Sequence, residues 1–388
     1  MSFAILFNKF SASTFQIKKM RFILFLCACF CFQFAFSQNS YYVKGKVLDD
    51  SSSLPLEGAS VICENTTRGT FTDTEGSFGL QLPMGGHNIV VSFSGYDMKE
   101  IRISTAEDVA ADREIRLKKK TKQLEEVVVQ ASNEVADGWQ QYGKEFAAYF
   151  IGNSSNAAAC NVANPEVLKF FYSKKKNRLK VKIQADEPIV VMNYALGYKI
   201  RYMLDSFILD YANKKSSYAG AAFYQELDST ETQRNIWKIN REKAYYGSRL
   251  HFIRCFYDST LAENGYTITD VEADSSNAPI NKVLIENPYD PSYYTVINEN
   301  EKEILLIGKY LIEYQGKEPM ERAYLKANKY PVSAKEQLST IELLDGFIMS
   351  ENGFFYNHKN VINSGYWAWK NLADQLPYDY WPDGALSE

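Results

Sequence analysis

Residues 70–94 read TFTDTEGSFGLQLPMGGHNIVVSFS, and this stretch decides the fold of the N-terminal part of the chain. Apolar and polar residues alternate over 70–72, 77–82 and 87–94, as they do in half-buried strands. Asp73 and Gly76 stand in the first gap, where an Asp side chain bonds the backbone ahead and Gly takes a positive φ. We read Asp73 as a turn residue of this kind and not as a calcium ligand, because a calcium loop needs more oxygen ligands at fixed spacing.

The same alternation extends outward in both directions. It predicts four further strands, at 42–48, 59–64, 98–103 and 113–117. Short strands at about ten-residue spacing, with turn residues between them, are typical of a small β-sandwich. The sequence therefore predicts a seven-stranded β-sandwich over residues 42–118.

This segment also resembles a known family. The landmarks, in order, are Gly45-Lys46-Val47, Pro55-Leu56-Glu57-Gly58-Ala59, Thr72-Asp73 with Gly76 and Phe78, Pro83 with Gly85, and Gly95-Tyr96. Together they resemble the carboxypeptidase regulatory-like domain, which has a transthyretin-like fold. In Gram-negative bacteria that family often precedes TonB-dependent outer-membrane receptors and other secreted domains. The resemblance implies an extracytoplasmic accessory module without peptidase groups of its own.

The first 37 residues have the pattern of an export signal. Lys18, Lys19 and Arg21 precede the apolar run Phe22–Phe32, and a small-x-small end follows. We expect cleavage between Ser37 and Gln38, and a protein of the periplasm or the outer membrane. Two alternatives stay open: lipoprotein processing at the lipobox-like string 26–29, and a retained membrane anchor.

Residues 119–133 form a predicted linker, which contains the string Leu-Glu-Glu-Val-Val-Val at 124–129. A similar string follows this domain in receptors of the starch-utilisation type. An extended β-branched segment can add a strand to a partner's sheet, so docking to an energy-transducing partner is one interpretation. An edge strand or a tether between domains is the other. The rest of the chain holds few of the strands that a large receptor barrel needs.

Residues 134–388 are predicted to form a larger, strand-rich α+β domain. Helical spacing occurs at 134–151 and 229–244, and Ser248 is a plausible N-cap for a third helix at 249–261. The predicted strands are 168–173, 179–185, 198–211, 218–226, 266–271, 304–307, 310–314, 339–344, 347–350 and 354–356. The whole resembles an uncharacterised C-terminal region found behind the regulatory domain. Its landmarks are Asn164-Pro165, Leu196-Gly197-Tyr198, Tyr246-Gly247-Ser248, His251-Phe252 with Arg254, Gly365-Tyr366-Trp367 and Leu376-Pro377 with Asp379-Tyr380.

The aromatic residues Tyr366, Trp367 and Trp369 are the candidate ligand-binding residues. Trp367 and Trp369 are two positions apart, so in a strand they would face the same side. One interpretation is a surface that stacks on a sugar or a peptide. The alternative is that they close the core.

Candidate catalytic and metal-binding residues are few. The three histidines, His87, His251 and His358, have no HxxH or HxxE spacing, which excludes a zinc carboxypeptidase. His251 and Cys255 lie at i and i+4, which is half of a tetrahedral site, and a core cysteine beside a hydrogen-bonded histidine fits them better. Ser248 lacks a Gly-x-Ser-x-Gly setting. Cys160 and Cys255 are either free thiols or a disulfide, and we expect no metal and no cofactor.

Composition limits the function further. A chain of 388 residues with a net charge of −4 gives no reason to expect a nucleic-acid partner, since phosphate binding needs clustered Lys and Arg. We therefore expect a secreted cell-envelope accessory or binding protein without catalytic activity, which presents β-rich surfaces to a protein or glycan ligand. The first alternative is a hydrolase that acts on peptides or glycans. The second is a partner subunit of a TonB-dependent outer-membrane uptake system.

Overall fold

The structure, a computed structural model, describes residues 40–83, 85–104, 113–120, 133–184, 187–213, 215–271, 282–356 and 358–383. The described residues from Tyr41 onward belong to one compact unit. The predicted export signal with its cleavage site at Ser37 and Gln38, and the string at 124–129, lie outside the described residues. The domain boundaries at 118 and 134 stay predictions. Where the chain is described, no helix has the length and apolar character needed to cross a membrane.

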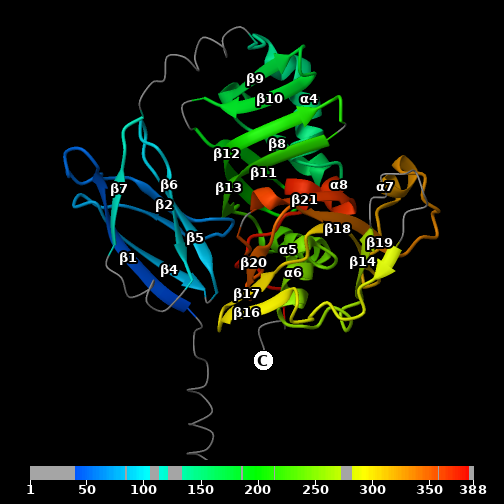
Figure 1. The fold of residues 1–388 in the computed structure, drawn as a ribbon. Helices are drawn as coiled ribbons and strands as arrows, with labels where there is room; N and C mark the ends of the chain where they lie inside the picture. The colour runs from blue at the N-terminus through cyan, green and yellow to red at the C-terminus, as the bar shows by residue number, and fades with distance from the viewer. Residues whose placement is uncertain are drawn as a thin grey trace, which may run out of the picture. The chain divides into compact units, whose positions relative to one another are not determined.

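The N-terminal part is a β-sandwich, as predicted (Figure 1). One sheet has the order β4-β1-β7, and the other has the order β3-β2-β5-β6. The strands are β1 (Ser40–Asp49), β2 (Ser60–Cys63), β3 (Gly69–Phe71), β4 (Ser77–Pro83), β5 (His87–Ser92), β6 (Lys99–Ile103) and β7 (Arg113–Leu117). Val47, Val61 and Val91 from the two sheets are fully buried between them. The described residues thus give the sandwich the seven strands that the alternating pattern predicted.

The turn after β3 has the predicted chemistry. The Asp73 carboxylate accepts hydrogen bonds from the backbone N–H groups of Glu75 and Ser77, at 2.9 and 2.8 Å. Gly76 has φ of 71°, and a Cβ there would lie 2.6 Å from the Val47 carbonyl oxygen. The Asp73 side chain therefore stabilises the turn between β3 and β4 by binding backbone N–H groups of the turn.

A third sheet follows the sandwich, with the order β8-β11-β12-β10-β9 and β13 paired to β12. Its strands are β8 (Cys160–Val162), β9 (Leu168–Ser173), β10 (Arg178–Ile183), β11 (Ile189–Asn193), β12 (Tyr198–Asp210) and β13 (Lys215–Glu226). The helix α4 (Gly138–Phe150) packs on it through Phe146 and Phe150, which contact Phe207 and Tyr202. The short helical turns η1 (Ala157–Ala159) and η2 (Pro165–Val167) flank β8.

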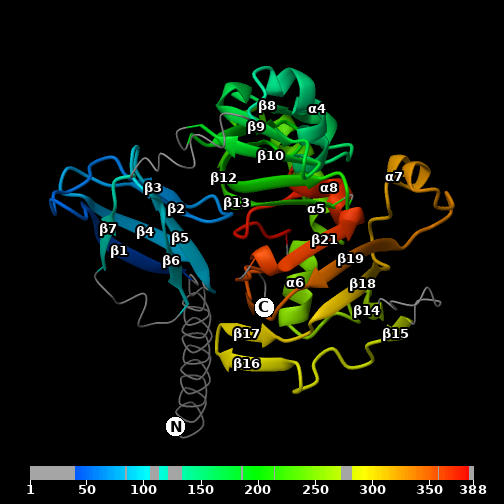
Figure 2. The ribbon, with the colours of Figure 1, turned by 45° about the horizontal axis from the view of Figure 1, so that its top comes forward.

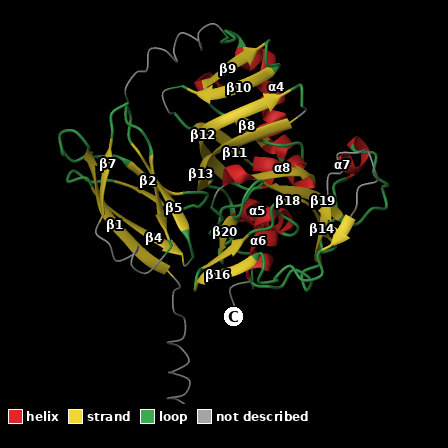
Figure 3. Cartoon of the chain, in the orientation of Figure 1, coloured by secondary structure: helices red, strands yellow, loops and turns green. Residues whose placement is uncertain are grey.

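Two more sheets follow along the chain (Figures 2 and 3). The order β15-β14-β18-β19-β21 joins β14 (Tyr266–Val271), β15 (Lys282–Leu284), β18 (Gly308–Tyr314), β19 (Gln337–Leu343) and β21 (Val361–Gly365). The order β16-β17-β20 joins β16 (Tyr294–Asn298), β17 (Glu301–Ile304) and β20 (Phe347–Ser350). The helices are α5 (Glu231–Tyr245), α6 (Arg249–Tyr257), α7 (Arg322–Ala327) and α8 (Tyr366–Asp374), with the turn η3 (His358–Asn360).

The mostly β fold with a larger α+β part is confirmed, and some element predictions are wrong. The predicted strand at 304–307 overlaps β17 only at Ile304, and residues 354–356 form one isolated bridge through Phe355. The strands β8, β11, β15, β16 and β21 and the helices α7 and α8 were not predicted. Residues 366–369, whose same-side argument assumed a strand, are helical. Gly365 ends β21 with φ of 73°, which favours glycine, and the chain turns there into α8.

Candidate functional site

A cavity of about 390 Å³ lies in the C-terminal part of the unit. One wall comes from β12 and β13, through Tyr202, Ser217 and Tyr218, and the opposite wall comes from α6, β21 and α8. These elements lie together in Figures 1 and 2. A volume of this size is typical of small-molecule sites, which combine aromatic surfaces with a few polar groups.

A β-bulge shapes the strand wall. The register of β12 against β13 shifts between Leu204 and Ser206, and a bulge of this kind bends the strand and strengthens its twist. Gly220 stands opposite, where a Cβ would lie 2.2 Å from the Met203 carbonyl oxygen. Only glycine allows the two backbones to approach so closely here. Ser206 and Gly220 both line the cavity.

The helical wall carries backbone strain. Asn371 lies inside α8 with φ of 42° and ψ of −142°, outside the helical region. A non-glycine residue in such a conformation costs about 1–3 kcal/mol and is held only by its surroundings. Here Asn371 Nδ2 donates to the Tyr149 carbonyl oxygen at 2.8 Å. Strain of this kind concentrates at ligand sites, and Asn371 lines the cavity.

Several polar atoms at the cavity have no hydrogen-bond partner among the described residues. They are His358 Nε2, Asn363 Oδ1 and the Tyr378 hydroxyl, all of them buried. Burial lowers the pKa of His358 to about 3, and the positive charge of Arg249 acts in the same direction. The imidazole is therefore neutral at physiological pH. Native proteins leave few buried polar groups unpaired, so three such atoms in residues that line one cavity are unusual.

The charged groups of the cavity are Arg249, Lys370 and Asp374. Asp374 accepts hydrogen bonds from Ser154 Oγ at 2.5 Å and from Asn156 Nδ2 at 2.9 Å. Burial raises the pKa of Asp374, and its hydrogen bonds and Lys370 oppose that shift. The Asp374 oxygens therefore have protein partners. The two cations contact only aromatic rings: Lys370 Nζ lies 5.1 Å from the ring centre of Tyr366, and the Arg249 guanidinium lies 5.1 Å from that of Phe355.

The turn between β2 and β3 extends to the edge of β13. Asn65 N–H donates to the Ala222 carbonyl oxygen at 2.7 Å, and Tyr224 N–H donates to the Thr66 carbonyl oxygen at 3.0 Å. Asn65 is 4% exposed and lines the cavity. The sandwich therefore supplies one residue of the cavity wall, and it covers part of a strand edge that would otherwise present free backbone groups.

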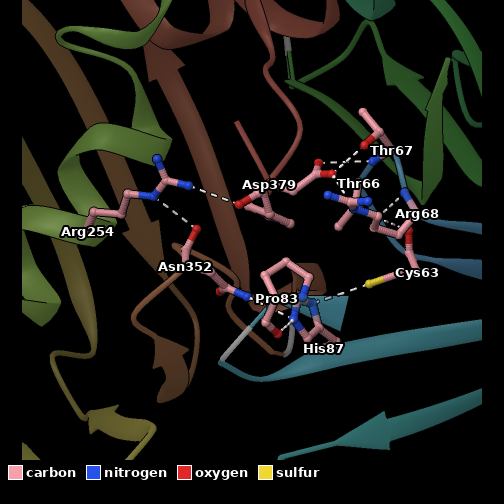
Figure 4. Close-up of polar contacts among 10 residues, drawn as sticks. Cys63, Thr66, Thr67, Arg68, Pro83, His87, Arg254, Asn352 and Asp379 are labelled. Atoms are coloured by element: carbon pink, nitrogen blue, oxygen red, sulfur yellow. Dashed lines mark hydrogen bonds and ion pairs between the residues drawn. The ribbon is translucent and has the colours of Figure 1, made fainter. Parts of the chain in front are cut away.

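The C-terminal segment around Asp379 contacts the turn between β2 and β3, and Arg254 binds the backbone of that segment (Figure 4). Asp379 accepts a hydrogen bond from Thr67 N–H at 3.0 Å, bonds the Thr67 hydroxyl, and lies 3.4 Å from Arg68 Nε. Arg254 of α6 donates to the carbonyl oxygens of Tyr378 at 3.0 Å and Tyr380 at 2.9 Å. A buried arginine thus fixes the segment that carries Asp379.

Cys63, His87 and Asn352 meet near this turn, and they are the residue types of a cysteine-hydrolase triad (Figure 4). Cys63 Sγ lies 3.3 Å from His87 Nδ1, and Asn352 Nδ2 lies 3.4 Å from His87 Nε2. His87 Nε2 lies 2.9 Å from the Pro83 carbonyl oxygen and donates to it. His87 Nδ1 is then the acceptor for the Cys63 thiol. Burial raises the pKa of Cys63 and lowers the pKa of His87 to about 4, so both groups are neutral and unreactive.

The candidate residues Tyr366, Trp367 and Trp369 do not form one surface. Trp367 lines the cavity, is 7% exposed and donates through Nε1 to the Gly247 carbonyl oxygen at 2.8 Å. Tyr366 is buried against Tyr324, and Trp369 donates through Nε1 to Glu321 at 3.0 Å. The same-side argument is wrong because the three residues begin a helix, where residues two apart point to different sides. Their ligand-binding role stays a prediction.

The other predicted residues have structural partners. Ser248 caps α6, because its hydroxyl accepts the His251 N–H at 3.1 Å. His251 Nδ1 lies 3.0 Å from the Tyr266 hydroxyl, and burial lowers the pKa of His251 to about 4. Cys63, Cys160 and Cys255 are all free, so the Cys160–Cys255 disulfide is absent from the structure. The described part of the chain contains no cluster of three or more His, Cys, Asp or Glu residues suited to a metal.

Comparison with known proteins identifies the N-terminal part. A family model, the CarboxypepD_reg-like domain, matches residues 43–129. These residues are a carboxypeptidase regulatory-like domain. The TonB-dependent receptor SusC of Bacteroides thetaiotaomicron is 42% identical over 95 residues, which are 24% of this chain and 9% of that receptor. This chain therefore corresponds to less than a tenth of the receptor's length.

Two solved structures are similar to parts of the chain. A cohesin–X-dockerin complex of Acetivibrio cellulolyticus matches 20% of this chain and 51% of that chain, at 25% identity and a TM-score of 0.16. A DUF3823 family protein of Parabacteroides merdae matches 52% of this chain and 86% of that chain, at 8% identity and a TM-score of 0.17. Neither likeness supports an argument about function.

Sequence reasoning missed most of the cavity residues. Arg249, Lys370, Asn371 and Asp374 come from segments whose neighbours in space are far away in the chain. From the sequence, Arg254 was identified only as a landmark of the C-terminal region. However, a cation within the apolar helical run Leu250–Phe256 indicates a buried arginine that binds carbonyl groups.

Proposed function

We propose that the protein is an exported cell-envelope accessory protein that binds a small glycan in the cavity and has no catalytic activity. The observation that carries the proposal is the cavity of about 390 Å³, whose lining combines the aromatic residues Tyr218 and Trp367 with polar residues such as the serines of β12 and β13. Aromatic faces pack on the apolar faces of sugar rings, and the polar atoms suit sugar hydroxyl groups. The carboxypeptidase regulatory-like domain and its likeness to a TonB-dependent receptor support a place in the envelope.

The state of the buried histidines and thiols supports the absence of catalysis by these groups. A general base or nucleophile works best with a pKa near the working pH. Burial instead lowers the pKa of His87 and of His251 to about 4 and raises the pKa of Cys160 and of Cys255 to about 12. None of these groups would take up or release a proton readily at neutral pH. The alternative function, a hydrolase of peptides or glycans, would require that the protein converts such a substrate to product.

The test is a titration of the purified chain with a panel of mono- and disaccharides, followed by calorimetry and tryptophan fluorescence. Ser217→Trp fills the cavity from an exposed position of β13, and Gln225→Trp is its control, because Gln225 is exposed on the same strand and outside the cavity. We expect at least one sugar to bind the wild-type protein and Gln225→Trp, and not Ser217→Trp. No binding across the panel, or conversion of a bound sugar to product, would contradict the proposal.

A link to TonB-dependent uptake is the second candidate. The 42% identity to a TonB-dependent receptor favours it, but that identity is limited to 95 residues. Co-purification of the chain with an outer-membrane receptor from its own envelope would support a role as a partner subunit. Recovery of the chain alone from solubilised membranes would count against that role and leave the binding proposal intact.

A further inference from the structure

We propose that the ligand of the cavity is an anionic sugar and that Lys370 binds its charged group. This inference rests on the proposed function and deepens it. The Lys370 side chain is 8% exposed, lines the cavity and has no hydrogen bond or ion pair with any described residue. A buried ammonium without a hydrogen bond or an ion pair is costly, and an anionic ligand would lower that cost.

The nearby carboxyl group of Asp374 interacts with Lys370 through charge, but it makes no hydrogen bond with the ammonium. Asp374 accepts hydrogen bonds from Ser154 and Asn156. No ion pair within 4.0 Å joins Lys370 to Asp374 in the described residues. Each oxygen of Asp374 thus accepts one hydrogen bond from the protein, while the Lys370 ammonium lies 5.1 Å from the centre of the Tyr366 ring.

Arg249 adds a second positive charge to the same cavity. It is half-buried at the first position of α6, with no hydrogen bond or ion pair to the described residues. The N-terminal end of a helix carries partial positive charge from its N–H groups, and Ser248, Arg249 and Leu250 of this end all line the cavity. The buried Lys370 side chain, which makes no hydrogen bond or ion pair, independently favours a ligand with negative charge. Two cations, neither of which makes a hydrogen bond or an ion pair with a described residue, line the cavity with one carboxyl group, so the cationic side chains outnumber the acidic one.

The residues that line the cavity favour an acidic sugar over a simple anion. The Trp367 and Tyr218 rings, with the serines of β12 and β13, provide the surface and the hydroxyl groups that a sugar ring needs. Charge interactions are strong in such a site because buried surroundings screen them poorly. A carboxylate and a phosphate share this chemistry, and the probes below separate them.

The experiment titrates the purified full chain with galacturonate, galactose and galactose 6-phosphate, which differ only at C6. We expect at least one of the two anionic sugars to bind at least tenfold more tightly than galactose, and the preferred one identifies the anionic group. Lys370→Met keeps the apolar stem of the side chain and should remove the preference. Arg249→Gln should reduce it, and Lys326→Met, an exposed change on α7, should leave it unchanged.

The outcomes separate this inference from the proposed function. The proposal of an anionic ligand is wrong if galactose and both acidic sugars bind equally, or if the preference persists in both Lys370→Met and Arg249→Gln. Either result leaves the proposed glycan site unaffected. A lack of binding for the three probes overturns the anionic inference, and the wider sugar panel then decides the proposed function. Melting temperatures of the variants show that each one is folded.

Discussion

The guanidinium of Arg254 lies 3.5 Å from the ring centre of Trp381. Arg254 is 2% exposed, and it donates to the carbonyl oxygen of Asn352 at 3.0 Å as well as to those of Tyr378 and Tyr380. One side chain therefore joins α6, the turn after β20 and the C-terminal segment. A planar guanidinium can make these bonds and stack on an aromatic ring at the same time, which a lysine cannot.

Arg254→Met should lower the free energy of unfolding by about 3 kcal/mol or more, because it leaves three carbonyl groups without their donor. Urea unfolding followed by tryptophan fluorescence measures this change. Arg234→Met is the control, since Arg234 is exposed on α5 and should change stability by less than about 0.5 kcal/mol. Equal stability of the two variants would show that Arg254 does not hold the C-terminal segment.

Asp379→Asn should loosen the turn between β2 and β3. The amide of asparagine cannot accept from both the N–H and the hydroxyl of Thr67 as the carboxylate does, so we expect a loss of about 1–2 kcal/mol. Thr67→Val should add little to Asp379→Asn, because the two changes remove the same bond. Hydrogen exchange of the Thr67 amide measures the local effect. Asp383→Asn, at an exposed ion pair with Lys238, should leave that exchange rate unchanged.

Local sequence patterns predict the β-sandwich, but they do not predict the cavity. Alternation and turn residues such as Asp73 and Gly76 act between neighbours in the chain, so they predict strands directly. The cavity depends on Asn65, Gly220 and Lys370, which meet only after three separate segments have packed. Gly365 also shows the limit of local patterns, because its positive φ ends a strand and starts a helix, and neither β21 nor α8 was predicted.

Glu64 makes stability depend on pH. Burial raises its pKa from 4.5 to about 7, and Glu100 acts in the same direction, while Asn88 and Asn65 donate to it and oppose the shift. His358 Nε2 lies 3.9 Å from Glu64 and is neutral in this range. Because the folded pKa is above the unfolded one, the stabilising effect of Glu64 is complete below pH 4.5 and is lost as the pH rises through 7.

Glu64→Gln removes that dependence. Relative to the wild type, it should gain about 3 kcal/mol in the free energy of unfolding between pH 4.5 and pH 8. Urea unfolding at several pH values provides the measurement. Glu57→Gln, on an exposed residue of the same sandwich, should run parallel to the wild type. A constant difference between Glu64→Gln and the wild type at all pH values would mean that Glu64 titrates normally.

The three thiols of the described chain should differ in reactivity. Cys63 and Cys255 are buried, whereas Cys160 is half-exposed and donates to the Asn156 carbonyl oxygen at 3.4 Å. Burial raises the pKa of all three, so the reactive thiolate is scarce at pH 8. We expect an aromatic disulfide reagent to label Cys160 slowly in the folded protein, and Cys63 and Cys255 only on unfolding. Rapid labelling of Cys63 would revive a reactive Cys63–His87 pair, and Cys63→Ala would confirm the assignment.

Trp367 and Trp369 should respond differently to truncation. Trp367 is 7% exposed and contacts Phe252 at a ring distance of 5.5 Å, so Trp367→Ala should cost about 3–5 kcal/mol. Trp369 is half-buried, and Trp369→Ala should cost less. Trp367→Phe keeps most of the packing and loses the donor to Gly247, so it separates the two roles of this residue. If Trp367→Phe folds and no longer binds sugar, Trp367 contacts the ligand. If it folds and binds normally, Trp367 belongs to the core alone, and the polar atoms around His358 and Asn363 carry recognition.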